Sequence, residues 1–125
     1  MVASDSFLAF DRTATGDVAP IRANREGQGC FLDLATDLAA GELWVTTSNK
    51  TFEVFARTAD GMAPPLRSIS HTGTGAMFLD PSRGEAVVTS PNRIDTFDTT
   101  SGATIRTIQG SASGLDGVND VAVAP

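Results

Sequence analysis

Three aspartates are the residues of this sequence best suited to chemistry. Asp33 and Asp80 each lie at the end of a short apolar run, "CFLDL" and "MFLDP", and Asp120 precedes a third run, "VAVAP". If these runs are inner strands of a repeated β-fold, the three carboxylates would surround one channel. Carboxylates in that arrangement can hold a divalent cation or serve as acid and base. A metal site in this chain would therefore consist of Asp33, Asp80 and Asp120.

The spacing of these acids also allows a structural role and a separate ligand site. Asp33 and Asp80 recur at matching places, which favours aspartates that accept N–H bonds in their own turns. Asn119 and Asp120 differ, because a glycine and an alanine stand before "MFLDP". A polar pair that departs from a repeat at a channel mouth is a candidate for ligand contacts. We therefore predict ligand binding at Asn119 and Asp120, and no catalytic residue.

The single histidine and the single cysteine are both given structural interpretations. His71 follows an outer strand in "SISHTGTG" and lacks a second His or a nearby Cys, so we expect a surface loop residue. Cys30, aligned with Met77 and Val121, is interpreted as a small buried hydrophobe that begins an inner strand. No intrachain disulfide can form, and no cofactor is predicted.

A repeat along the chain determines where these residues lie. The stretch "FDRTATGDVAPIR" from Phe10 recurs as "FARTADGMAPPLR" from Phe55, and a more diverged copy, "FDTTSGATIRTIQG", begins at Phe97. The spacings are 45 and 42 residues, and "ELWVTTS" matches "EAVVTSP" in the same register. Short apolar and β-branched runs between Gly, Pro, Asp and Ser, repeated at this period, are typical of β-propeller blades.

The repeat predicts an all-β fold in which each blade has four antiparallel strands. Residues 1–125 form one propeller segment: a partial blade with only its third and fourth strands at 4–24, full blades at 30–70 and 77–108, and an inner strand at 118–124. Within the first full blade we expect the inner strand at 30–33, followed by a turn. Because a propeller closes with about four to eight blades, this chain is either a fragment or part of an oligomeric propeller.

The open faces of the outer blades predict self-association. Monomers seldom expose apolar sheet faces of this size. In a homodimer, the inner strand 118–124 of one copy would join strands in 4–24 of the other, giving six blades on a twofold axis. That shared blade would lack its second strand, which favours the fragment alternative.

The composition argues against two classes of partner. The formal net charge is −6, from 15 acidic and 9 basic residues, whereas phosphate backbones are bound by clustered Lys and Arg. No basic run and no stretch of about 18 apolar residues is present, so neither a membrane surface nor a membrane span is predicted. A soluble chain is expected, and the sequence is compatible with an extracytoplasmic location in a bacterium.

Several stretches resemble the repeats of bacterial β-propeller proteins related to the NHL-repeat group. They are "FDRTATGDVAPIR", "ELWVTTSNKTFEVFARTADGMAPPLRSI" and "TIRTIQGSASGLDGVNDVAVAP", and the resemblance covers nearly all of the chain. Two departures are Trp44 for the usual Tyr and Ala124 for an Asp. The resemblance implies the propeller fold but not one function, because such propellers include binding modules, metal-dependent lactone hydrolases and surface proteins. We expect a binding or scaffold module without catalysis; the alternative is part of a metal-dependent lactonase-type hydrolase.

Overall fold

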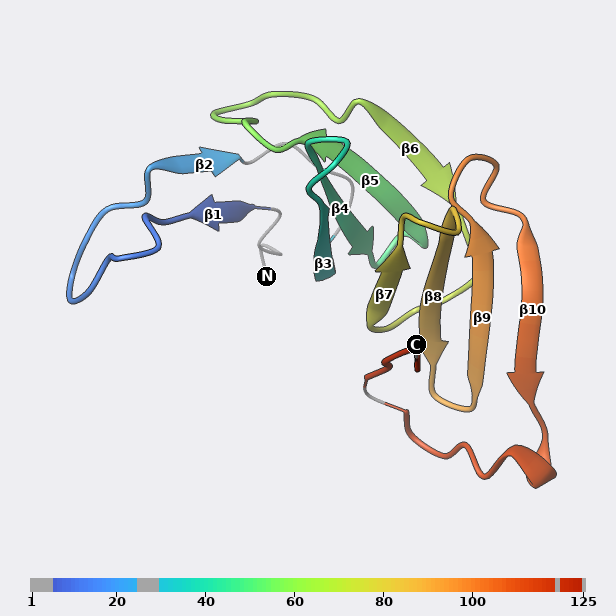
Figure 1. The fold of residues 1–125 in the computed structure, drawn as a ribbon. Coiled ribbons are helices and arrows are strands. Elements are labelled where there is room, and N and C mark those ends of the chain that lie inside the picture. The colour runs from blue at the N-terminus through green and yellow to red at the C-terminus, as the bar shows by residue number, and fades with distance from the viewer. Residues whose placement is uncertain (1–5, 25–29, 119, 125) are drawn as a thin grey trace.

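The chain folds into three antiparallel sheets. The computed structural model describes residues 6–24, 30–118 and 120–124 (Figure 1). The first sheet pairs β1 (Phe7–Ala9) with β2 (Arg22–Asn24), and the other two have the strand orders β3-β4-β5-β6 and β7-β8-β9-β10. Their bounds are β3 Phe31–Asp37, β4 Glu42–Thr47, β5 Thr51–Ala56, β6 Arg67–Ser70, β7 Met77–Asp80, β8 Glu85–Ser90, β9 Arg93–Asp98 and β10 Thr104–Gln109, with a 3-10 helix at Ser111–Ser113. The all-β prediction with four-stranded antiparallel units is confirmed, and in the described residues the sheets do not close on themselves.

The first sheet repeats the outer half of the second. The N–H of Ile21 donates to the carbonyl of Ala9 at 2.7 Å, and the N–H of Leu66 donates to the carbonyl of Val54 at 2.6 Å. These two pairs occupy the same place in the repeat. The sheet of β1 and β2 therefore corresponds to the third and fourth strands of a four-stranded unit.

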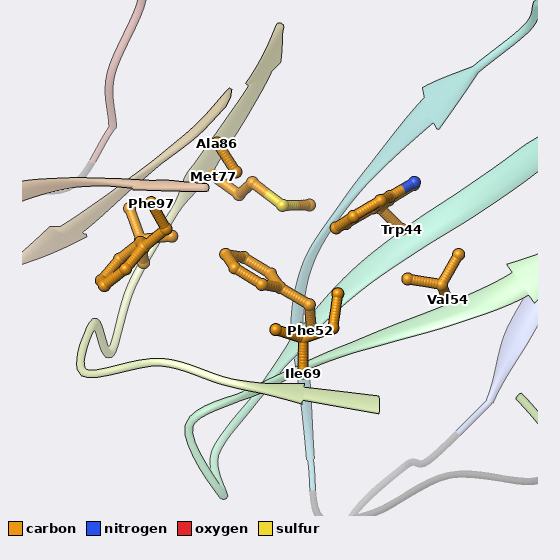
Figure 2. Packing of buried hydrophobic residues seen from close by; sticks show 8 residues of the cluster. Trp44, Phe52, Val54, Ile69, Met77, Ala86 and Phe97 are labelled. Atoms are coloured by element: carbon orange, nitrogen blue, oxygen red, sulfur yellow. The ribbon is translucent and has the colours of Figure 1, made fainter. Parts of the chain in front are cut away.

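The core lies mainly between the second and third sheets. Figure 2 shows Trp44 and Phe52 of the second sheet facing Met77 and Phe97 of the third. The inner strands β3 and β7 lie side by side at this junction. A second cluster joins Phe7, Val45, Phe55 and Ala59, with Phe31 packed against it. Alternate residues of each strand thus face one neighbouring sheet or the other, which is what stacked sheets require.

Gly102 allows the hairpin between β9 and β10 to approach the second sheet closely. Its φ is 75°, in the left-handed region, and its N–H donates to the carbonyl of Asp98 at 2.8 Å. A Cβ at this position would lie 2.5 Å from Cγ2 of Ile69 and 2.5 Å from the carbonyl oxygen of Ser70. Glycine is required here both by the turn and by the neighbouring strand.

The inner strand of the second sheet is longer than expected and in a different register. The predicted strand ended at Asp33, but β3 continues to Asp37 and pairs Leu34 with Val45, where Met77 pairs with Val88. Leu34 therefore corresponds to Met77, Asp37 to Asp80, and Asp33 to Ala76. The predicted equivalence of Asp33 with Asp80 is wrong. The alternation of "LATD" fits the pleat, and the turn begins only at Leu38, where Asp37 accepts the N–H of Ala40.

The expected inner strand at 118–124 forms no ladder in the described residues. Residues 121–124 instead line a hollow over the third sheet, together with Glu85, Ile94 and Arg106.

Candidate functional site

Asp33 links the inner strands of two sheets. Its Oδ1 accepts the N–H of Leu34 at 2.8 Å, and its Oδ2 accepts the N–H of Met77, the first residue of β7, at 2.8 Å. The side chain is half-buried at the junction. Both carboxylate oxygens thus accept backbone N–H groups. The donors lie within β3 and at the start of β7, so the predicted hydrogen bonds in a turn directly after Asp33 are not formed.

Asp120 repeats the local half of this arrangement. Its Oδ1 accepts the N–H of Val121 at 2.8 Å, just as Asp33 accepts that of Leu34. With the corrected register, Asp120 corresponds to Asp33 and does not break the repeat. Asn119 lies outside the described residues, so the ligand role proposed for this pair stays a prediction.

Asp80 lies at the end of β7 and makes different contacts. Its Oδ1 accepts the hydroxyl of Ser82 at 2.6 Å, and Nε of Arg83 lies 3.7 Å from its Oδ2. The Ser82 hydrogen bond is the main reason that the pKa of Asp80 lies below its usual value. In residues 6–24, 30–118 and 120–124, no three His, Cys, Asp or Glu side chains group as a metal site.

Two buried carboxylates were missed by the sequence reasoning. Glu53 in β5 is 0% exposed and accepts the hydroxyls of Thr51 at 3.1 Å and Ser68 at 3.0 Å through Oε1. Buried acids normally need such partners. The signal was an acid inside the apolar run "TFEVF", next to a strand that carries serine.

Asp95 in β9 holds the corresponding position in the third sheet. It is 2% exposed, its Oδ1 accepts the hydroxyl of Thr107 at 2.6 Å, and Nε of Arg93 lies 2.7 Å from its Oδ2. In both sheets, therefore, a buried acid on the third strand binds a hydroxyl on the fourth. The repetition of this pair points to a structural role.

The prediction of a surface position for His71 is wrong. The side chain is buried between the sheets, with its ring 4.2 Å from that of Phe52 and 5.5 Å from that of Phe97. Its Nδ1 accepts the N–H of Gly73 at 3.1 Å. Burial lowers the pKa of His71 below its usual value. A position just beyond a strand predicts a loop residue, but β6 ends at the junction with the next sheet.

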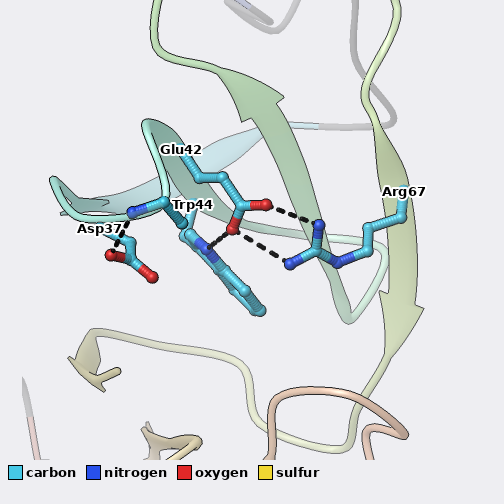
Figure 3. A network of polar contacts seen from close by, with 5 residues as sticks. Asp37, Glu42, Trp44 and Arg67 are labelled. Carbon is cyan, nitrogen blue, oxygen red and sulfur yellow. Dashed lines mark hydrogen bonds and ion pairs between the residues drawn. The ribbon is translucent and has the colours of Figure 1, made fainter. Parts of the chain in front are cut away.

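A polar network fastens the second and fourth strands of the second sheet (Figure 3). Arg67 donates to both carboxylate oxygens of Glu42, at 2.8 and 3.1 Å, and Nε1 of Trp44 donates to Oε2 at 3.1 Å. The guanidinium carbon lies 5.2 Å from the centre of the Trp44 ring. The Arg67 hydrogen bonds lower the pKa of Glu42, and those to Glu42 raise the pKa of Arg67.

The third sheet contains the same ion pair, and the first contains half of it. Arg106 donates to Glu85 at 2.8 Å, in the positions of Arg67 and Glu42. Arg22 is the corresponding arginine of β2, half-buried, and no ion pair with another described residue is formed.

An unpartnered apolar edge borders β1. In the described residues β1 pairs only with β2, and Leu8 is 52% exposed. A hollow of about 360 Å³ lies between this edge and β3, with Phe7 and Phe31 in its wall. A second hollow, of about 210 Å³, lies between the first and second sheets and is lined by Leu8, Ala9, Arg22, Leu34, Leu43 and Arg57, among others.

Cys30 precedes β3 rather than beginning it. The residue is half-buried, and its N–H donates to the hydroxyl of Ser48 at 2.9 Å. The expected full burial is therefore not reached.

Comparisons with known proteins assign no family. The sequence matches neither a protein-family model nor a curated protein. None of the described segments forms a helix with the length and apolar character needed to cross a membrane.

Proposed function

We propose that this chain is a β-propeller repeat module that serves as a binding or scaffold domain without catalysis. The observation that carries the proposal is the Asp33 carboxylate, which joins the inner strand of one sheet to that of the next. A contact of this kind stacks similar sheets in sequence, as the blades of a propeller are stacked. The relationship to the NHL-repeat group is part of the same proposal and is supported by the quoted sequence stretches.

Further blades cover both ends of the segment in this proposal. At one end, Asp120 already accepts the N–H of Val121, and its second oxygen would accept the first N–H of the next inner strand. At the other end, Leu8 and Phe10 expose apolar surface beside an unpaired strand edge. A second copy of the chain is the favoured partner, since twofold assembly is the commonest closed symmetry. Its segment 118–124 would supply the inner strand of the shared blade and leave the place of the second strand open.

Light scattering on the purified chain tests the self-association. One chain has a mass of 13.0 kDa, and we expect a mass of two chains. Leu8→Asp at the open edge should shift the sample to the single-chain mass. The control is Leu38→Asp in the β3–β4 turn, where the side chain is 70% exposed, and it should leave the dimer intact. A single-chain mass for the unaltered protein would contradict the homodimer.

The alternative of a metal-dependent lactonase-type hydrolase receives no support from the contacts of Asp33, because both of its oxygens accept backbone N–H groups. Calorimetric titration with Ca²⁺ tests it directly. Tight binding that is lost in Asp33→Asn would favour the hydrolase over the scaffold.

A further inference from the structure

The edge of β1 has features that specify what can pair with it. Arg22, Arg67 and Arg106 occupy one position of the repeat, and the last two bind a glutamate at the first residue of the second strand of their own sheets. The described part of the first sheet has no second strand and gives Arg22 no carboxylate. The repeat therefore indicates a missing carboxylate on a missing strand.

The hollow beside Arg22 corresponds to a space that is filled at the next junction. Its wall contains Leu34 and Leu43, which correspond to Met77 and Ala86 in the third sheet. Between the second and third sheets, Met77 and Ala86 pack with Trp44, as Figure 2 shows. The side chain that corresponds to Trp44 in a completed first sheet would occupy the hollow of about 210 Å³.

The charge at this hollow favours the same occupant. Arg22 and Arg57 both line it, so two basic residues border the place at which a carboxylate would enter. An acid at this point would face Asp11 across the strands, but the third sheet already accommodates that pairing, because Glu85 lies opposite Asp98. Asp98 is held in its turn by the N–H groups of Thr100 and Ser101, and Asp11 accepts the N–H of Thr13 in the same way.

We propose that the free edge of β1 binds a two-stranded β-hairpin. The second strand of this hairpin begins with an acidic residue whose carboxylate pairs with Arg22. Two residues later the same strand carries a bulky apolar side chain that fills the hollow. This inference rests on the proposed function, since such a hairpin is the inner half of a blade. It adds the chemistry by which the edge recognises its partner. The occupant is a strand partner with a glutamate or aspartate at a fixed position, joined through backbone hydrogen bonds as in β-augmentation.

A synthetic peptide of residues 30–48 with Cys30→Ser is a suitable probe, because it carries Glu42 and Trp44 at the required spacing. Fluorescein on its N-terminus allows binding to the full chain to be followed by anisotropy. We expect saturable binding, weakened about 3- to 10-fold by Glu42→Gln in the peptide, as for loss of a partly exposed charge-assisted pair. Trp44→Ala in the peptide should weaken binding further than Glu42→Gln does.

Substitutions in the protein complete a double-mutant cycle with the peptide variants. Arg22→Gln should weaken the parent peptide as much as Glu42→Gln does, and combining the two should cause little additional loss. Arg106→Gln is the matched control, since this arginine already pairs with Glu85, and it should leave peptide binding unchanged. Arg22→Glu with a Glu42→Lys peptide should restore part of the affinity.

The outcomes separate this inference from the function on which it rests. If the parent peptide fails to bind protein that light scattering shows to be a single chain, the completion of the first sheet by a blade hairpin is wrong, and the proposed module loses its main prediction. If the parent peptide binds and Glu42→Gln binds equally well, the edge accepts a hairpin but Arg22 does not select its carboxylate. That second result would overturn the inference alone.

Discussion

The N–H of Met77 lies 2.8 Å from Oδ2 of Asp33, although 44 residues separate them in the sequence. The same carboxylate accepts the N–H of Leu34, so a single side chain binds the inner strands of two sheets. Each bond pairs a charged acceptor with a backbone donor at a half-buried junction.

Removing this carboxylate should loosen the junction. We expect Asp33→Ala to reduce the free energy of unfolding by about 1.5 to 3 kcal/mol, the range for hydrogen bonds to a charged group. Urea denaturation followed by Trp44 fluorescence measures the loss. The control is Asp80→Ala, which removes an acid whose side-chain contacts stay with Ser82 and Arg83 of the following turn, and it should cost less. Equal losses in the two variants would mean that the hydrogen bond between Asp33 and Met77 adds nothing to the free energy of unfolding.

Phe55 and Phe10 occupy one repeat position with different surroundings. Phe55 is 0% exposed against Phe7 and Phe31, whereas Phe10 is 49% exposed. Phe55→Ala should therefore destabilise the chain by about 3 to 5 kcal/mol, as for a buried aromatic truncated to alanine. Phe10→Ala in the single chain should cost far less. Similar losses for both, measured by urea denaturation, would show that Phe10 is covered in solution.

The two glycines Gly102 and Gly16 separate the effect of a turn from that of a close approach. Both have φ in the left-handed region, 75° and 77°, but of the two only Gly102 has neighbouring atoms in the path of a Cβ. Gly16→Ala should cost about 1 kcal/mol for the backbone conformation. Gly102→Ala should cost about 1 to 3 kcal/mol more, because Ile69 and Ser70 must move. Thermal unfolding of the two variants measures the difference, and equal shifts would exclude a tight contact at Gly102.

His71 should make stability depend on pH in the weakly acidic range. Its pKa in the folded chain lies below the usual 6.5, mainly through burial, although Asp95 opposes this shift and Lys50 adds to it. The unfolded chain then binds the proton more readily, so stability is complete above pH 6.5 and falls as the pH drops below it. Urea denaturation between pH 7.5 and 5.5 should give a smaller fall in His71→Gln than in the unaltered chain. The same fall in both would remove His71 as the cause.

The strands could be predicted from the sequence, but the contacts between neighbouring sheets could not. Turn residues such as Gly84 and Gly102, with apolar runs between them, predicted the hairpins because both signals are local. The predicted correspondence between Asp33 and Asp80 was wrong because "LDLATD" contains two aspartates four residues apart. Only the pairing of β3 with β4 shows that Asp37 corresponds to Asp80.

Burial of a side chain between two sheets was the other feature that the local sequence could not predict. His71 follows a strand and precedes two glycines, which is typical of a loop, yet the next sheet covers it. Gly73 was the available signal, because a Cβ there would lie 2.2 Å from Cγ1 of Val88, so the chain must pass close to the third sheet. Such proximity depends on how two sheets stack.

The buried acids have a consequence for a chain made of near copies. Strands from different repeats resemble one another enough to pair wrongly while the chain folds. Glu53 is matched with the short hydroxyl side chain of Ser68, and the shorter Asp95 with Thr107. If β6 slipped by one residue along β5, Arg67 or Ile69 would stand opposite Glu53, and the buried carboxylate would lose the hydroxyl of Ser68. The buried acids therefore select the register of the fourth strand, because a slipped pairing leaves a buried carboxylate without its hydroxyl donor.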